Sequence, residues 1–301
     1  MHDSACPRLL IVGCGDIGLR VLALVRKRWR VLALTSNPAR VAELRHAGAL
    51  PLVADLDRPA SLGRLAGLAS HVLHLAPPPR DGRTDPRTRA LLAALARGAL
   101  PTRLVYASTS GVYGDCAGAR VDETRAPNPA SDRAWRRLDA EDAVRHFGRT
   151  HGVIASVLRV PGIYALDRAG GDPRERVARA TPLLAANEDV YTNHIHADDL
   201  ARICVAALLR GAPQRVYHAS DDSSLKMGEH FDAVADAFGL PRAPRLPRTE
   251  LARRLTPLQM SFLAESRRLV NRRLSAELRV TLAYPTPGVA WGLASRGRGG
   301  P

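Results

Sequence analysis

A glycine-rich turn near the N-terminus, GCGDIG at residues 13–18, leaves few folds open to this chain. It follows the short apolar run 8–12 and begins an amphipathic stretch of helical length. GxGxxG between a strand and a helix is typical of a dinucleotide-binding turn: Gly13 permits the tight turn, Gly15 lets backbone approach a pyrophosphate, and Gly18 lets the helix pack on the strand. The alternative, a turn that binds nothing, is disfavoured by this position. The residues predicted at the phosphates, near the free N–H groups of the helix, are Gly13, Gly15, Asp16, Ile17 and Gly18.

The first half of the chain alternates short apolar runs with stretches of helical length. This alternation predicts an α/β fold of Rossmann type, a doubly wound parallel sheet with helices on both faces. After about residue 160 the regularity weakens, which indicates a smaller, irregular C-terminal substrate lobe. The predicted parts are an NAD(P)-binding core at 1–160, a mixed part at 161–295 with some segments returning to the core, and a disordered tail at 296–301. Strands are predicted at 8–12, 30–34, 49–54, 71–75, 103–107, 153–158 and 215–219, and helices at 38–46, 59–65, 84–97, 131–147, 198–210 and 227–238, with Ser131 and Asp198 as caps.

The composition is typical of a globular protein of a reducing compartment. The chain has 301 residues, 46% of them apolar, and no apolar run approaches the roughly 20 residues that a membrane helix needs. Its first residues lack a basic region followed by a hydrophobic stretch, so no secretory signal is expected. Four scattered cysteines form neither a CxxC pair nor a zinc-ligand spacing, which indicates reduced thiols. We therefore expect a cytoplasmic location, no membrane partner and no metal.

The net charge of +15 raises nucleic acid as a partner. The excess is nearly all arginine, since Lys27 and Lys226 are the two lysines, and the arginine clusters fall on several separate predicted elements. There is no aromatic interleaving and no nucleic-acid motif. An arginine-biased composition on solvated faces explains the charge better, so no specific nucleic-acid partner is expected.

The end of the second predicted strand bears on the choice of cofactor. An NAD site typically has an acidic residue there, whereas this chain has Thr35-Ser36-Asn37, with Arg40 one helical turn further on. A hydroxyl, an amide and a guanidinium can all receive a 2′-phosphate. Ser36 and Arg40 therefore favour NADP, with NAD left open and with an ordinary surface role as the alternative for Arg40.

Several segments, in order along the chain, resemble an extended short-chain dehydrogenase/reductase of the NAD-dependent epimerase/dehydratase group. The resemblance covers nearly the whole chain, and its ordered set of motifs is far more specific than the glycine turn alone. Atypical bacterial members end in a similar helix, ESRRLVNRRL, at residues 265–274 here. The segments are the glycine turn, ADL at 54–56, HLAP at 74–77, YASTSGVYG at 106–114, LR at 158–159, PGIY at 161–164 and NHIHADDL at 193–200.

The resemblance implies roles for individual residues. Asp55 and Leu56 would lie by the adenine, and Ala76 and Pro77 along the cofactor. Thr109 would be the catalytic hydroxyl that precedes Val-Tyr-Gly. The alternative for Ser108, Thr109 and Ser110 is a polar strand end that satisfies its own backbone.

The chain departs from the family pattern at the catalytic pair. The family needs Tyr-x-x-x-Lys on the helix after the fifth strand, where the lysine holds the ribose and lowers the tyrosine pKa. With Leu138, Ala140 and Glu141 as anchors, these two positions fall on Arg133 and Arg137. Arginine is a donor only and stays protonated, so Arg133 cannot take the acid/base role, while Arg137 could still bond a ribose, a carboxylate or a phosphate.

Two hypotheses for function follow. The first is an NAD(P)-dependent oxidoreductase or epimerase-like enzyme acting on a carbonyl, alcohol or sugar-nucleotide-like substrate held by Thr109, with Arg133 and Arg137 favouring an anion and the proton coming from Ser110, Tyr164, water or the substrate. The second is a non-catalytic NADP-binding sensor or scaffold. The substrate is not assigned by the sequence, and a homodimer stays open. His194, His196, Asp198 and Asp199 are better explained by a strand end followed by a capped helix than by a metal site.

Overall fold

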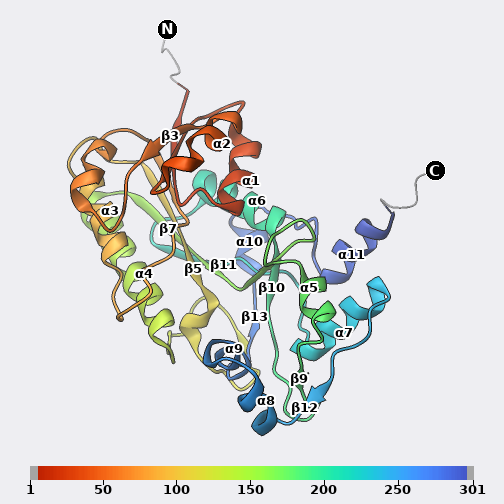
Figure 1. The fold of residues 1–301 in the computed structure, drawn as a ribbon. Coiled ribbons are helices and arrows are strands. Elements are labelled where there is room, and N and C mark those ends of the chain that lie inside the picture. The colour runs from red at the N-terminus through yellow and green to blue at the C-terminus, as the bar shows by residue number, and fades with distance from the viewer. Residues whose placement is uncertain (1–5, 297–301) are drawn as a thin grey trace.

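The computed structural model describes residues 6–296, and its centre is a seven-stranded sheet in which every neighbouring pair is parallel. The strand order is β11-β7-β5-β4-β1-β2-β3 (Figure 1). This is the predicted Rossmann-type α/β sheet, and the fold class is confirmed. The strands are β1 (Arg8–Val12), β2 (Arg30–Thr35), β3 (Leu50–Val53), β4 (His71–His74), β5 (Arg103–Thr109), β7 (Ile154–Val160) and β11 (Arg215–His218).

Both faces of the sheet are buried under helices. In β1, Leu9 and Ile11 belong to the core on one face, and Leu10 and Val12 to the core on the other. Alternate residues of a strand point to opposite faces, so an unbroken apolar run needs cover on both. One face is covered by α1 (Asp16–Val25), α2 (Val41–His46) and α6 (Ala197–Arg210), and the other by η2 (Pro59–Leu65), α3 (Pro86–Leu95) and α4 (Asp132–His151).

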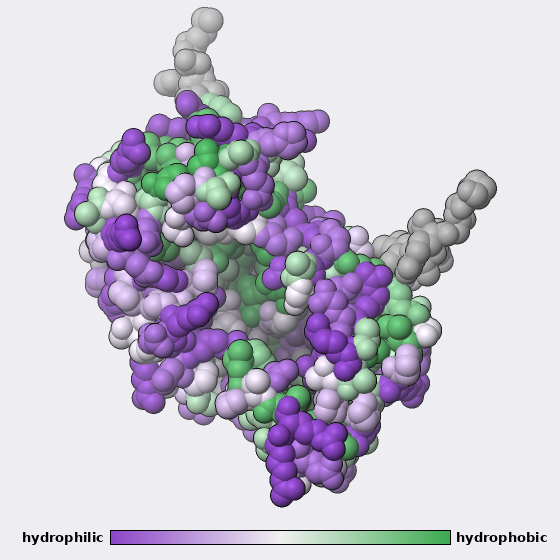
Figure 2. Space-filling model, viewed as in Figure 1, coloured by the Kyte–Doolittle hydropathy of each residue, from purple (hydrophilic) through white to green (hydrophobic). Residues whose placement is uncertain are grey.

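The strand order reverses between β1 and β4, which are neighbours in the sheet. At such a switch point the connections leave in opposite directions, and a crevice opens at the carboxyl ends of the strands. Figure 2 shows this face of the molecule hollowed at its centre, with hydrophobic residues on the floor and hydrophilic residues around the rim.

The C-terminal part is built from short elements around the crevice. Three two-stranded sheets, β6–β13, β8–β10 and β9–β12, join segments that are distant in sequence. A separate small core contains Tyr164, Val234 and Trp291. The elements are η1 (Pro38–Arg40), η3 (Ser110–Tyr113), β6 (Arg120–Val121), β8 (Gly162–Tyr164), α5 (Pro173–Ala178), β9 (Leu183–Leu184), β10 (His194–His196), α7 (Met227–Phe238), β12 (Arg245–Leu246), α8 (Arg248–Arg254), α9 (Pro257–Leu263), β13 (Arg268–Leu269), α10 (Arg272–Ala276) and α11 (Pro287–Arg296).

Two local expectations are wrong. The segment 265–274 is not one helix, because Arg268–Leu269 forms β13 beside β6 and the helix α10 starts only at Arg272. The extended backbone makes hydrogen bonds to other segments that a helical backbone could not make. For example, the Leu269 N–H donates to Asn193 Oδ1 at 2.8 Å. Helix α6 is capped by His196, whose Nδ1 accepts from the Asp198 N–H, and not by Asp198 itself.

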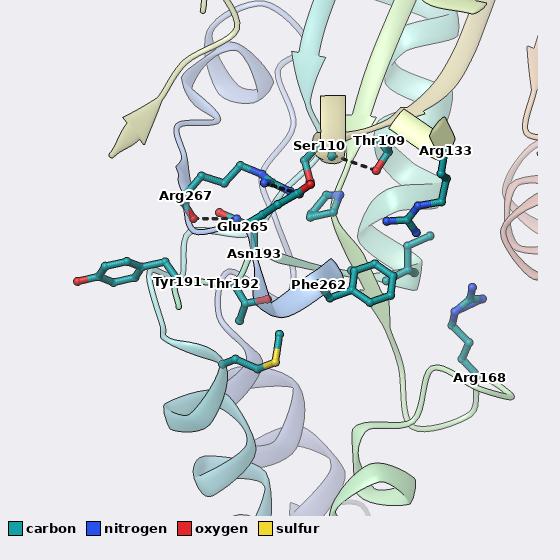
Figure 3. A pocket seen from close by; sticks show the side chains of 15 residues that line it. Thr109, Ser110, Arg133, Arg168, Tyr191, Thr192, Asn193, Phe262, Glu265 and Arg267 are labelled. Atoms are coloured by element: carbon teal, nitrogen blue, oxygen red, sulfur yellow. Dashed lines mark hydrogen bonds and ion pairs between the residues drawn. The ribbon is translucent and has the colours of Figure 1, made fainter. Parts of the chain in front are cut away.

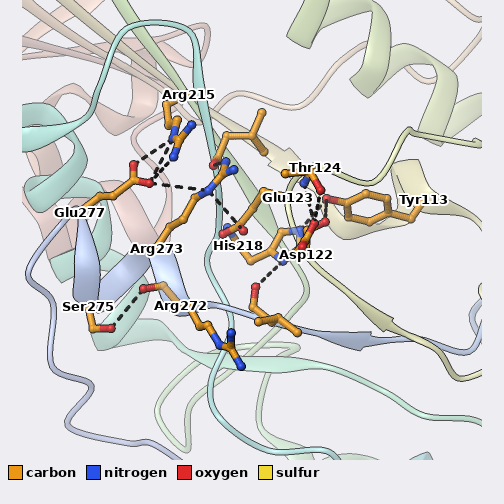
Figure 4. Close-up of polar contacts among 12 residues, drawn as sticks. Tyr113, Asp122, Glu123, Thr124, Arg215, His218, Arg272, Arg273, Ser275 and Glu277 are labelled. Atoms are coloured by element: carbon orange, nitrogen blue, oxygen red, sulfur yellow. Dashed lines mark hydrogen bonds and ion pairs between the residues drawn. The ribbon is translucent and has the colours of Figure 1, made fainter.

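Polar contacts fasten the C-terminal segment to the edge of the main sheet (Figure 4). The guanidinium of Arg273 lies 3.6 Å from the Glu123 carboxylate, and Arg215 on β11 pairs with Glu277. His218 donates from Nδ1 to the Val270 carbonyl, which leaves Nε2 to accept from the Tyr113 hydroxyl at 2.6 Å. These contacts join three segments that are distant in sequence, 113–123, 215–218 and 270–277.

Among residues 6–296, no helix combines the length and the apolarity needed to cross a bilayer. The four cysteines are free. Arg296 is the last residue of α11, and the rest of the predicted tail, 297–301, lies outside the described residues.

Candidate functional site

A cavity of about 560 Å³, here called the cofactor cleft, lies at the carboxyl ends of β1 to β4. Eight of the eleven predicted cofactor residues line it, although they come from four separate strand ends. Asp16, Ile17 and Gly18 do not line it, because they lie inside the first turns of α1. The eight are Gly13, Gly15, Ser36, Arg40, Asp55, Leu56, Ala76 and Pro77.

The three motif glycines occupy three different surroundings. Gly13 has φ +83°, and a Cβ there would lie 2.5 Å from the Ala76 nitrogen. At Gly18 a Cβ would lie 3.1 Å from Cys14 Sγ, where the helix meets the strand. At Gly15 a Cβ would meet nothing within 4 Å, and no side chain caps the helix that begins there. Open space over an uncapped helix start fits a pyrophosphate, so the described residues fit a dinucleotide.

The side chain of Asp16 is engaged in ion pairs. Its carboxylate accepts from Arg20 at 3.0 Å and from Arg168 at 2.7 Å, and Arg20 also pairs with Asp198 and Asp167. Arg20 and Asp16 belong to α1, whereas the other three residues come from the C-terminal part. The network therefore joins the start of α1 to the C-terminal part, and the backbone N–H of Asp16 is left to bind a phosphate.

Arg40 reaches the glycine turn, but Glu43 shares its guanidinium. Nη1 donates to the Cys14 carbonyl at 2.6 Å, and Nε and Nη2 both donate to the Glu43 carboxylate. These hydrogen bonds lower the pKa of the exposed Glu43. Ser36 is exposed beside Arg40, while Asn37 caps η1 by accepting from the Ala39 N–H.

Arg87 on α3 also lines the cofactor cleft and was not predicted from the sequence. Its Nη1 donates to the Pro77 carbonyl at 3.2 Å, and its other nitrogens pair with Asp57, which also lines the cleft. The only signal in the sequence is an arginine just inside a helix that follows Asp85-Pro86, which many surface helices share.

A second cavity of about 370 Å³, here called the threonine cavity, lies at the end of β5 (Figure 3). In this view Thr109 and Arg133 lie together on one side, and Arg267 lies with its ion-pair partner Glu265 on the other. Phe262 of α9 and Arg168 also line the cavity, and none of these four C-terminal residues was predicted. The complete lining is Thr109, Ser110, Gly111, Arg133, Pro161, Gly162, Ile163, Arg168, Tyr191, Thr192, Asn193, Met227, Phe262, Glu265 and Arg267.

Of the three polar residues at the end of β5, Ser108 has a structural role, whereas Thr109 and Ser110 line the threonine cavity. Ser108 is buried and donates to Glu141, which forms a fully buried ion pair with Arg159. Thr109 caps η3: its Oγ1 accepts from the Gly111 N–H at 3.2 Å, so its hydroxyl hydrogen is free to donate into the cavity. Ser110 is 4% exposed and also lines the cavity.

Arg133 and Arg137 both lie beside Thr109, in different ways. The Arg133 guanidinium stacks on the Phe262 ring, 4.5 Å from its centroid. Arg137 is turned toward β5, where its Nη1 donates to the Ala107 carbonyl at 2.7 Å and to the Tyr106 hydroxyl. Burial raises the pKa of Tyr106 to about 12, so this phenol is poorly suited to acid/base chemistry near neutral pH.

A third cavity of about 300 Å³, here called the arginine pocket, lies between the loop after β4 and the first turns of α4. It shares Pro77 with the cofactor cleft, and Thr109 and Arg133 with the threonine cavity. The three cavities are therefore consecutive along the carboxyl edge of the sheet. The arginine pocket is lined by Pro77, Pro78, Pro79, Arg80, Thr109, Arg133, Arg136 and Arg137.

Tyr164 does not belong with Thr109. It lines a separate cavity with His196 and Tyr284, and it is 4% exposed. Burial and the nearby carboxylates of Asp221 and Asp199 raise the pKa of the Tyr164 hydroxyl. The expectation that Tyr164 could supply a proton at Thr109 is therefore wrong.

Comparison with known proteins shows what this chain is similar to. The family model for the NAD dependent epimerase/dehydratase family matches residues 9–219. Methionine adenosyltransferase 2 subunit beta from Danio rerio is 27% identical over 213 residues, which are 65% of this chain and 64% of that protein. UDP-glucose 4-epimerase from Azospirillum brasilense is 26% identical over 155 residues, 50% of this chain and 39% of that protein. The chain thus spans less than two thirds of the length of these curated relatives.

Solved structures match over almost the whole chain. A functionally unknown conserved protein from Silicibacter pomeroyi is 28% identical, with a TM-score of 0.81 over 97% of this chain and 99% of that one. UDP-glucose 4-epimerase from Thermotoga maritima is 17% identical, with a TM-score of 0.76 over 96% and 99% of the two chains. UDP-glucuronic acid 4-epimerase from Bacillus cereus, solved with NAD, is 17% identical, with a TM-score of 0.73 over 95% and 94%. The two epimerases show likeness of fold.

Proposed function

The chain belongs to the NAD-dependent epimerase/dehydratase family, and from this premise we propose that it is an NADP-preferring oxidoreductase or epimerase-like enzyme with an altered acid/base. Its substrate would be a small anionic carbonyl or alcohol, of which a sugar nucleotide is one example. The observation that carries the proposal is the continuity of the cofactor cleft with Thr109. Pro77 ends the cleft, and the next cavity along the edge contains Thr109 and Arg133.

The residues at Thr109 can polarise a carbonyl. Bound nicotinamide would supply or accept a hydride at the carbon. The Thr109 hydroxyl would donate to the substrate oxygen, and the Arg133 guanidinium would stabilise negative charge that develops there. Since arginine does not release its proton, the proton would come from Ser110 or from water in the cavity.

A turnover screen tests this proposal. NADPH oxidation would be followed with aldehydes and ketones, NADP+ reduction with alcohols, and epimer formation with nucleotide sugars. Each assay would compare the native chain, Thr109→Val and Thr109→Ser. Loss of the hydroxyl in Thr109→Val should lower kcat about 100-fold at unchanged NADPH affinity. Thr109→Ser keeps a hydroxyl and should retain most of the native kcat. If no substrate class gives turnover above background although NADPH binds, the enzyme assignment fails.

The preference for NADP rests on Ser36 and Arg40, which line the cleft where a carboxylate would select NAD. Glu43 neutralises part of the Arg40 charge and would lie near a 2′-phosphate. We therefore expect Arg40→Ala to weaken NADPH binding about tenfold with little effect on NADH, and Glu43→Gln to strengthen NADPH binding. Fluorescence titration measures both; equal effects on the two cofactors would contradict the preference.

The second candidate is a non-catalytic NADP-binding sensor or scaffold. It is favoured by Arg133 and Arg137 in place of tyrosine and lysine, and one relative is itself named as a subunit of methionine adenosyltransferase. Two results would favour this candidate: tight NADPH binding without turnover, and a partner protein whose affinity for this chain changes when NADPH binds.

A cytoplasmic location and a small-molecule partner go with either candidate. The positive charge is spread over ion-paired arginines such as Arg20, Arg87 and Arg215, which fits a solvated, arginine-rich surface better than a specific nucleic-acid site.

A further inference from the structure

The arginine pocket holds four guanidinium groups without a counter-charge. Arg80 comes from the loop after β4, and Arg133, Arg136 and Arg137 come from the first turns of α4. Its described lining contains neither Asp nor Glu. Within residues 6–296, none of the four arginines forms an ion pair, whereas the other cavity arginines do. Those pairs are Arg40–Glu43, Arg87–Asp57, Arg168–Asp16 and Arg267–Glu265.

Helical spacing concentrates this charge. Positions 133, 136 and 137 are three and four residues apart and share one face of α4. They also lie at the positive end of a 20-residue helix, where the dipole favours an anion. Desolvation, and then the neighbouring charges of Arg137, Arg136 and Arg267, lower the pKa of Arg133, against an opposing effect of Glu265.

Arg136 provides an independent indication of a ligand. It is 7% exposed, and its Nη1 donates to the Gly82 carbonyl at 2.5 Å. Its Nε is buried and has no hydrogen-bond partner. A nearly buried guanidinium that has no carboxylate partner among the described residues is costly unless an anion in the pocket offsets its charge.

We infer that the arginine pocket binds a phosphoryl group of the substrate, a phosphate monoester or a diphosphate, while the reacting carbon lies at Thr109. Planar guanidinium groups match the paired oxygens of a phosphoryl group, and several of them suit a dianion. Thr109 and Arg133 line both the arginine pocket and the threonine cavity, so one small molecule can reach both. This inference rests on the proposed function for the role of Thr109, but not for the anion site itself.

The phosphoryl group could instead belong to the cofactor, because Pro77 joins the pocket to the cofactor cleft. The cofactor's own phosphates have other expected sites: the pyrophosphate at Gly15 and the 2′-phosphate at Arg40. An anion that binds while the cofactor is present would therefore come from the substrate.

The test is calorimetric titration of the full chain with inorganic phosphate and with pyrophosphate, at constant ionic strength in chloride, with and without saturating NADPH. Arg80→Gln and Arg133→Gln should each weaken anion binding about tenfold. Both side chains are exposed, so these variants should fold. Arg64→Gln removes the same charge from an exposed site outside the three cavities and should leave the affinity unchanged.

Phosphate binding that persists at saturating NADPH and weakens in both pocket variants supports the inference. No binding beyond chloride, or equal weakening by Arg64→Gln, overturns it. Binding that disappears with NADPH assigns the anion to the cofactor and overturns the assignment to substrate. If NADPH itself does not bind but the affinity for phosphate still depends on Arg80 and Arg133, the proposed function fails and the anion site is still supported.

Discussion

Gly13 and Gly15 are two residues apart and differ in what a side chain would meet. The backbone of Gly13 is left-handed and is pressed against Ala76, whereas Gly15 faces the open cleft. An added side chain should therefore damage stability at Gly13 and ligand binding at Gly15.

We expect Gly13→Ala to lower the free energy of unfolding by about 2–4 kcal/mol, from a strained φ and a close contact with Ala76. Gly15→Val should unfold at nearly the native midpoint but bind NADPH at least about 100-fold more weakly, because its side chain would occupy the pyrophosphate position. Urea unfolding and fluorescence titration measure the two effects. Native-like NADPH binding by Gly15→Val would show that the dinucleotide lies elsewhere.

Helix α4 carries much of the site, since Arg133, Arg136 and Arg137 all lie in its first turns. Its start is set by Ser131, whose hydroxyl accepts from the Ala134 N–H, and its end by Gly152 in the left-handed conformation. The prediction of a helix at 131–147 gave the correct cap but ended the helix four residues too early. The helix continues because Phe147 and Gly148 are buried and extend its packed face.

Ser131→Ala should cost about 1 kcal/mol of stability through loss of the cap. It should also weaken phosphate binding, because the first turn that holds Arg133 would fray. Ser275→Ala is the matched control: its hydroxyl donates to the Arg272 carbonyl and caps no helix start. Chemical denaturation and phosphate titration give the two readouts; equal losses in both variants would contradict the role of the cap.

The whole molecule buries several neutral histidines. Burial lowers the pKa of His74 to about 3 and the pKa values of His194 and His218 to about 4. Between these values and about 6.5 the unfolded chain binds more protons than the folded one, so stability falls as the pH falls through this window. Burial also lowers the pKa values of His71, His196 and His230, which reinforces this trend. Burial raises the pKa of Asp221 to about 7 and raises the pKa of Glu123, and these two carboxyl groups oppose it.

We expect the free energy of unfolding to decline steeply between pH 6.5 and pH 4.5. His194 stacks on His230, with ring centroids 3.8 Å apart, so His194→Phe keeps an aromatic partner and removes one titrating group. The slope should then decrease by about 1.4 kcal/mol per pH unit near pH 5. Urea titrations at several pH values measure it, with pH 7.5 checking that the variant folds. An unchanged slope would mean that His194 is not held neutral.

The sheet, its flanking helices and most of the cofactor cleft were predictable from the chain, because they depend on local physics. Apolar runs flanked by amphipathic stretches define buried strands and covering helices, and the glycines mark where backbone must turn or approach a phosphate. Carboxyl ends of parallel strands meet at one edge, so Gly13, Ser36, Asp55 and Ala76 could be placed together without coordinates.

Contacts between distant segments were not predictable in this way. The pairing of Arg268 with β6 overrode helix propensity in 265–274, and the ion pair of Arg168 with Asp16 joins residues 152 positions apart. In the sequence, Arg80 and Arg136 cannot be distinguished from ordinary surface arginines, and only the fold brings them into one pocket. The glycine turn thus predicted a dinucleotide site, because its backbone geometry is set by neighbouring residues. The charge of the arginine pocket arose only when separate segments met, because electrostatic fields depend on distance in space and not along the chain.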